Sequence, residues 1–282
     1  MLSGLVDFGI DGVVFDPNPV AGDYLDRSEE KLIVKPEQRS SLSKTLVEAM
    51  QRSLDDAQHG ASVDPQRRKL LLLGVFFLPY HGLVQASKSK KRPTSVVYAM
   101  LSEGVKFPNR DSGDVDLIVQ SSIRLREMVK TLKTLVLVEA KQRDEGSSQI
   151  MTPKQAREHG GLELLRLELG QEIASSKALW TDALTVAQIA EASGVFFNAD
   201  EEDVKLGDED YAALRSWADR CLVSKSWELP KLLDGREMMK KFKVKGSRVG
   251  ELVEELKLLQ MLNPTLTKDQ AEDHLRDFSS SL

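Results

Sequence analysis

Two aspartates separated by one residue, Asp114 and Asp116, have a spacing that suggests chemistry. On a strand, side chains two residues apart point to the same face, so such a pair can hold two magnesium ions on the phosphates of a nucleotide. That chemistry also needs a glycine-serine turn about ten residues upstream and a third carboxylate on a neighbouring strand. The elements around the pair therefore decide how it is interpreted.

The surroundings of the pair favour a helix. The upstream segment 102–104 reads Ser-Glu-Gly, which is the wrong order for a phosphate-binding turn, and its glutamate would repel a phosphate. Downstream, the apolar residues of segment 118–137 recur at helical spacing and do not form a partner strand. We expect Asp114 to cap a helix and Asp116 to lie in its first turn, near the positive end of the helix dipole. We assign no catalytic residue to this chain.

Helical patterns dominate the rest of the sequence as well. Asp64 followed by Pro65 predicts the start of a helix that runs through the apolar residues 70–77. Asp234 and Glu237 have the spacing of a capping box at the start of another helix. No run of alternating residues would build a sheet of several strands. We therefore expect an all-α protein, with an elongated helical body domain and a small C-terminal helical tail domain.

The sequence changes character near residue 226, where we divide the chain. Residues 1–225 form the expected helical body, and residues 226–282 form the expected helical tail. In the tail, a helix is expected to begin at Gly246 and another after Thr267. The first of these two helices carries an apolar stripe made of Val249, Leu252, Val253, Leu256 and Leu259.

Composition excludes several classes of protein. With Cys221 as the single cysteine no internal disulfide can form, and the scattered histidines give no zinc-ligand spacing. The longest apolar run, residues 70–79, is about half the length of a membrane span, so no membrane partner is expected. The net charge of −5 argues against nucleic-acid binding by the whole surface, but it leaves room for a local basic patch.

Residues 231–248 form such a patch. Seven basic residues stand there against two acidic ones, which gives a local net charge of +5 in an acidic protein. The sequence Lys-Gly-Ser-Arg at 245–248, at a helix start, offers free backbone N–H groups that can hold a phosphate. A solvated helix face explains the same charges, as it does for the basic loop 88–92, and both interpretations stay open. Phe242, the one aromatic residue among these cations, is expected in the core.

The same stretch carries a resemblance to a known family. Residues 232–264 (LLDGREMMKKFKVKGSRVGELVEELKLLQMLNP), followed by TKDQAEDHL at 267–275, resemble the C-terminal tail of CCA-adding tRNA nucleotidyltransferases. Residues 65–84, 92–118 and 167–184 resemble helical body segments of the eukaryotic form of that family. The resemblance as a whole covers most of the chain, about residues 40 to 280, and the tail motif is its most specific part.

The resemblance implies a tRNA partner, an intracellular location (nucleus, cytoplasm or mitochondrion) and a role in adding CCA to tRNA 3′ ends. In the family, body and tail hold the tRNA elbow and acceptor arm by phosphate contacts. The implied contacts in this chain are Arg236, Lys240, Lys241, Lys243, Lys245 and Arg248, with backbone donors at Gly246 and Ser247.

The family's catalysis resides in an N-terminal head that binds Mg²⁺ and CTP or ATP, and the motifs of that head do not occur in this sequence. The pair at 114 and 116 falls where the family has a helix start. We therefore expect the tRNA-binding part of such an enzyme, with no cofactor of its own. It would be a fragment, the product of an incompletely assigned gene, or a protein that acts without its head. Whether the chain is itself an enzyme stays open.

Two other functions are kept as alternatives. The first is a non-catalytic helical scaffold derived from the same family, in which the apolar stripe Val249–Leu259 faces a protein partner. The second is a free-standing nucleotidyltransferase that uses Asp114 and Asp116. Reversing Lys241, Lys245 and Arg248 to Glu would abolish RNA binding under the leading hypothesis and would change little for a scaffold.

Overall fold

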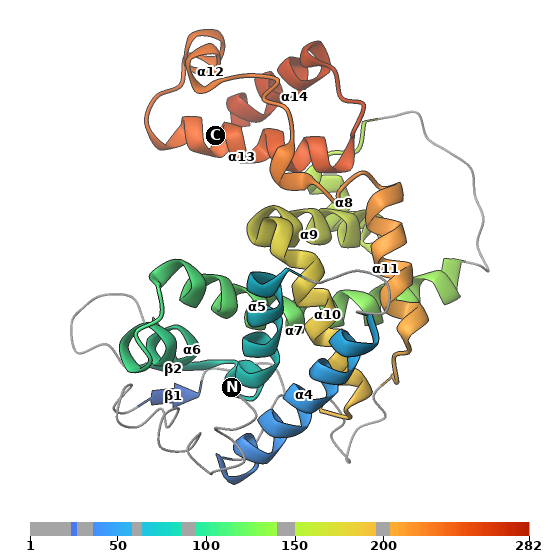
Figure 1. Ribbon diagram of the computed structural model, residues 1–282. Helices are drawn as coiled ribbons and strands as arrows, with labels where there is room; N and C mark the ends of the chain where they lie inside the picture. Colours follow the sequence, from blue (N-terminus) through green and yellow to red (C-terminus); the bar gives the residue numbers. More distant parts are fainter. Residues whose placement is uncertain are drawn as a thin grey trace. The chain divides into compact units, whose positions relative to one another are not determined.

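The computed structural model describes residues 24–26, 36–57, 64–85, 94–139, 150–195 and 204–281, and helices make up most of this part of the chain (Figure 1). The all-α fold class is therefore confirmed, whereas the predicted arrangement of body and tail stays a prediction. None of the described helices has both the length and the apolar character that crossing a membrane requires.

The chain divides into two compact units, each made from two separate stretches of sequence. The first unit comprises Met1–Arg126 and Leu179–Asp208, and the second comprises Glu127–Ala178 and Glu209–Leu282. The boundary predicted near residue 226 falls inside the second unit, so a separate domain over residues 226–282 stays a prediction.

The first unit contains five α-helices or parts of α-helices in its described residues. They are α4 (Pro36–Ala57), α5 (Pro65–Phe77), α6 (Val96–Ala99), the N-terminal half of α7 (Asn109–Glu139) and α10 (Trp180–Ala192). The predicted start of α5 is confirmed, since Asp64 accepts a hydrogen bond from the backbone N–H of Arg67 at 3.0 Å and Pro65 follows the cap. α4 packs against α5 and buries Leu46 and Met50 completely.

Gly74 of α5 allows a close approach to α7 and α10. A Cβ atom at this position would lie 2.9 Å from Cγ2 of Ile118 and 3.2 Å from Cγ2 of Val186. Both neighbours are completely buried, so a tightly packed core leaves them little room to move. A side chain at residue 74 would therefore disturb the centre of the first unit.

Three short strands form an antiparallel sheet in the order β1-β2-β3. They are β1 (Tyr24–Asp26), β2 (Leu83–Gln85) and β3 (Thr94–Ser95), and Val84 stands opposite both Leu25 and Ser95. Each strand is two or three residues long, which is too short for alternation to be visible in the sequence. For that reason this small sheet was not predictable from the sequence.

The second unit contains the C-terminal half of α7 and six further α-helices in its described residues. They are α8 (Pro153–His159), α9 (Gly161–Ser176), α11 (Asp208–Arg220), α12 (Gly235–Phe242), α13 (Ser247–Leu262) and α14 (Lys268–Ser281). A capping box starts α8, where Thr152 Oγ1 accepts from the N–H of Gln155 at 3.2 Å and Gln155 Oε1 accepts from the N–H of Thr152 at 2.9 Å.

Helices α12, α13 and α14 share an apolar core (Figure 1). Its fully buried members include Leu233, Met238, Val244, Leu252, Leu256, Leu259, Leu266, Ala271 and Leu275. The predicted stripe of α13 lies in this core, because its three leucines are buried and its two valines pack against the cluster. The core places the end of α12 beside the start of α13, with only residues 243–246 between them.

Candidate nucleic-acid interface

Asp114 and Asp116 lie inside α7, beyond its first turn. The helix begins at Asn109. The carbonyl of the preceding residue, Pro108, accepts hydrogen bonds from the N–H of Ser112 at 3.0 Å and from the hydroxyl of Ser112 at 3.1 Å. The predicted cap at Asp114 and the predicted first-turn position of Asp116 are therefore wrong. The helix starts further upstream, over residues 109–113, which carry no apolar side chain that would mark a helix in the sequence.

Helical geometry also turns these two aspartates away from each other. Residues two apart on a helix differ in direction by about 200°, so their carboxylates do not converge on shared metal ions. Among the residues that the structure describes, no group of three or more His, Cys, Asp or Glu side chains is arranged to hold a metal ion.

The two carboxyl groups have separate local partners. Asp114 lies 3.9 Å from Nε of Arg110, and burial raises its pKa. Asp116 Oδ2 accepts a hydrogen bond from Gln120 at 2.9 Å, whereas its buried Oδ1 has no hydrogen-bond partner. Burial raises the pKa of Asp116, and hydrogen bonds from Ser95 and Gln120 oppose that rise.

The predicted phosphate contacts lie together where α12 ends and α13 begins. Arg236 and Lys240 are one turn apart on α12, and Lys243 follows at its C-terminal end. Lys245 directly precedes the N-cap of α13, Gly246, and Arg248 is the second residue of that helix. All six predicted cationic side chains are exposed, so the structure brings together on the surface the residues that the sequence indicated.

One of these cations is already used inside the protein. Lys241 forms an ion pair with Glu272 of α14, and one turn earlier Glu237 accepts a hydrogen bond from Lys268 of α14 at 2.7 Å. The hydrogen bond from Lys268 holds the pKa of Glu237 below its usual range. These two pairs tie α12 to α14, so Lys241 is less suited to binding phosphate than its neighbours.

Four of the predicted cations are exposed and unpaired in the part of the chain that the structure describes. In the described part of the chain, the side chains of Arg236, Lys240, Lys243 and Lys245 form no ion pair and no hydrogen bond. Arg248 is exposed beside them but makes other interactions. We call these four cations, together with Gly246 and Ser247 at the start of α13, the basic end.

A capping box holds α12 in place. Asp234 Oδ1 accepts hydrogen bonds from the N–H groups of Arg236 and Glu237, both at 2.8 Å, and Glu237 Oε2 accepts from the N–H of Asp234 at 2.9 Å. Because Glu237 also binds Lys268, the same carboxylate fixes both the start of α12 and its contact with α14. The predicted capping box at Asp234 is confirmed.

The start of α13 is open to an anion. Gly246 precedes the helix with a φ of 62°, a backbone conformation that residues other than glycine rarely adopt. No side chain caps the helix. A Cβ atom at Gly246 would meet no described protein atom within 4 Å, so that position beside the turn is open. The first amides of a helix have no intrahelical acceptor and favour negative charge.

Lys243 has an unusual backbone for a lysine. Its φ of 56° and ψ of 30° lie in the left-handed region, which glycine or asparagine normally occupies at the end of a helix. A lysine in the left-handed backbone conformation lowers the stability of the fold relative to glycine. This position nevertheless holds a lysine, which places a positive charge at the centre of the basic end. The sequence pattern gave no sign of this conformation.

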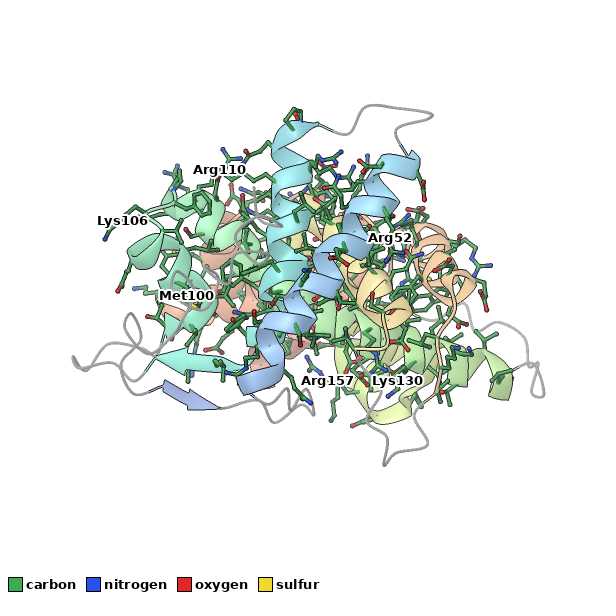
Figure 2. All side chains as sticks on the ribbon, turned by 60° about the horizontal axis from the view of Figure 1, so that its bottom comes forward. Arg52, Met100, Lys106, Arg110, Lys130 and Arg157 are labelled. Atoms are coloured by element: carbon green, nitrogen blue, oxygen red, sulfur yellow. The ribbon has the colours of Figure 1, made fainter. Side chains whose placement is uncertain are left out.

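The first unit offers fewer observations for an interface. The predicted basic loop 88–92 lies outside the described residues. Lys106 and Arg110 are exposed and project away from the ribbon near the start of α7 (Figure 2). Arg110 faces the carboxylate of Asp114, so its charge is partly matched.

Comparisons with known protein families, with curated proteins and with solved structures found no match.

Proposed function

We propose that this chain binds folded RNA, and specifically tRNA, through the basic end. The observation that carries the proposal is a group of four exposed cations beside the uncapped start of α13, and none of the four pairs with a described residue. In a chain of net charge −5, such a group is a local attractor for phosphates, which are the main source of affinity in nucleic-acid binding. The flanking backbone amides supply donors of fixed direction.

The choice of tRNA rests on the resemblance of residues 232–264 to the tail of CCA-adding tRNA nucleotidyltransferases. On this proposal the chain grips the elbow and acceptor arm of tRNA by phosphate contacts. The addition of C, C and A would belong to a catalytic head of that family, which uses CTP, ATP and Mg²⁺. None of the described residues is assigned to bond formation.

A triple variant tests the proposal against a matched control. We expect Lys240→Gln, Lys243→Gln and Lys245→Gln together to weaken binding to a tRNA transcript by about tenfold or more, because three phosphate contacts are lost. The control removes three exposed lysines of the second unit that lie outside the basic end: Lys154, Lys225 and Lys257. Equal affinities of the two triple variants would contradict the proposal, provided that circular dichroism shows both to be folded.

The free-standing enzyme has its own test. The chain is incubated with tRNA that lacks CCA, with CTP, ATP and Mg²⁺, and incorporation of nucleotides is measured. The proposal predicts no incorporation by this chain alone. Incorporation that Asp116→Ala abolishes would instead make Asp116 part of an active site.

A further inference from the structure

Met239 is an apolar side chain exposed in the middle of a charged surface. Its exposed fraction is 42%, whereas its neighbour Met238 is completely buried in the core of α12, α13 and α14. Burying Met239 is therefore not needed to fill that core. Methionine is flexible and polarizable, and it is common at surfaces that accept flat or variable partners.

Helical geometry defines the surroundings of Met239. Successive residues on a helix are turned by about 100°, so the order around α12 runs from Met238 through Phe242 and Met239 to Arg236 and Lys240. Phe242 packs against the apolar core and is only partly buried. An apolar strip thus leads from the core to the edge of the free cations.

The two flanks of those cations differ in character. On one flank, Glu237 and Lys241 pair with Lys268 and Glu272 of α14, so that side of α12 is covered. On the other flank lies the strip of Met239 and Phe242, which we call the apolar ledge. Arg236 and Met239 are neighbours at i and i+3 on the helix surface. No described polar side chain of α12 therefore separates Arg236 from the ledge.

We propose that the apolar ledge receives one unstacked base of the bound RNA while Arg236 and Lys240 hold the adjoining phosphates. This inference rests on the proposed function and adds a requirement to it, namely that the RNA presents a base outside a continuous duplex. Residues at i and i+3 have Cβ atoms about 5–6 Å apart, a separation that the phosphate and base of one nucleotide can bridge. Unstacked bases commonly bind to apolar and aromatic side chains beside cations.

The test compares Met239→Ala with the wild-type chain on two RNAs at several salt concentrations. The first RNA is a tRNA transcript, and the second is a fully paired RNA duplex of similar length. We expect Met239→Ala to weaken tRNA binding by about three- to tenfold, with an unchanged salt slope, and to leave duplex binding unchanged. Met239→Phe should keep or increase the affinity for tRNA, because a ring also stacks on a base. Leu137→Ala, which truncates another exposed apolar side chain of the second unit, is the control.

Each outcome decides the matter. Unchanged tRNA binding by Met239→Ala overturns the inference but leaves the proposed function intact, provided that the lysine triple variant is impaired. An equal loss on tRNA and duplex also overturns it, since the ledge would then contact backbone only. A wild-type chain that does not bind tRNA removes the proposed function and the inference together. Binding of wild type and Met239→Ala to anionic phospholipid vesicles is measured as well. If Met239→Ala loses vesicle binding and keeps RNA binding, the ledge belongs to a membrane surface and the inference is overturned.

Discussion

Glu237 of α12 accepts a hydrogen bond from Lys268 of α14 at 2.7 Å, and Lys241 forms an ion pair with Glu272 one turn further along. The two pairs have opposite polarity, so each helix contributes one acid and one base. Lys240 is adjacent to Lys241 in sequence, but it is turned from it by about 100° around the helix and pairs with no described residue of α14. Two neighbouring lysines therefore have different roles.

The first prediction separates these two lysines. Lys240→Gln should make the slope of log Kd against log salt for tRNA shallower by about 1, because one phosphate contact is lost. Lys241→Gln should leave that slope nearly unchanged and lower the melting temperature slightly, because it breaks the pair with Glu272. Fluorescence anisotropy at several salt concentrations measures the slope. Equal slope changes in the two variants would show that Lys241 is available to RNA after all.

The second prediction concerns the left-handed backbone of Lys243. Lys243→Gly should raise the free energy of unfolding by about 0.5–1 kcal/mol, because glycine adopts a φ of 56° without strain. The same change should weaken tRNA binding, because it removes a cation of the basic end. Stability and affinity would thus move in opposite directions.

Leu222 provides the matched control for Lys243. It has a φ of 59° and an exposed fraction of 63%, and it lies outside the basic end. Leu222→Gly should therefore increase stability to a similar degree without changing RNA affinity. Chemical denaturation and anisotropy on both variants check this, and an Lys243→Gly protein that binds tRNA as well as the wild type would remove Lys243 from the interface.

The third prediction concerns the buried ion pair of the first unit. Nε of Arg126 lies 2.7 Å from Oε2 of Glu191, and both side chains are less than a tenth exposed. Arg126→Met should destabilise the protein by about 3–5 kcal/mol, because it leaves an unpaired carboxylate in a buried place. Arg124→Met, a change of an exposed arginine on the same helix, is expected to cost little.

A double variant completes that test. Adding Glu191→Leu to Arg126→Met removes the stranded charge, and most of the lost stability should return. Urea denaturation measures all of these variants. A double variant that is less stable than Arg126→Met would mean that Glu191 stabilises the fold mainly through another contact, such as its acceptance of the N–H of Leu206 at 3.4 Å.

The fourth prediction concerns the pH dependence that Asp116 contributes. Burial raises its pKa in the folded state above the ordinary value of 3.8, so the folded state holds this proton more tightly than the unfolded state. Its contribution to stability is therefore favourable at low pH and is lost as the pH rises through the folded pKa. Asp116→Asn mimics the protonated form and should raise the melting temperature at neutral pH.

The gain from Asp116→Asn should shrink as the pH is lowered toward 3.8, where the wild-type carboxyl becomes protonated too. Calorimetry at several pH values measures it. A variant that melts below the wild type at neutral pH would show that the hydrogen bonds of the ionised carboxylate with Gln120 and Ser95 outweigh the cost of its burial.

Features that depend on neighbouring residues were predictable from the sequence. The capping boxes at Thr152 and Asp234 join residues three apart, and the apolar stripe of α13 follows from helical spacing alone. The cluster of cations was predictable for the same reason, since Arg236 to Arg248 are close in sequence. Local chemistry fixes such features before any tertiary contact forms.

Features that depend on distant residues were not predictable. The pairs that join α12 to α14 link residues 31 positions apart, so the sequence could not show that Lys241 already has a partner. The left-handed backbone of Lys243 and the exposure of Met239 follow from how α12 packs on the core. The start of α7 was placed too late because residues 109–113 carry no apolar side chain, so helical periodicity could not mark them.

The most direct test of the central claim is the salt dependence of tRNA binding. Four phosphate contacts, by Arg236, Lys240, Lys243 and Lys245, predict a slope of log K against log salt between about −2.8 and −3.6. The triple variant at residues 240, 243 and 245 should reduce the slope to about −0.7 to −0.9, with the control triple variant unchanged. A wild-type slope near zero, or the same slope in the wild type and the triple variant, would contradict the claim that this end of the second unit binds RNA.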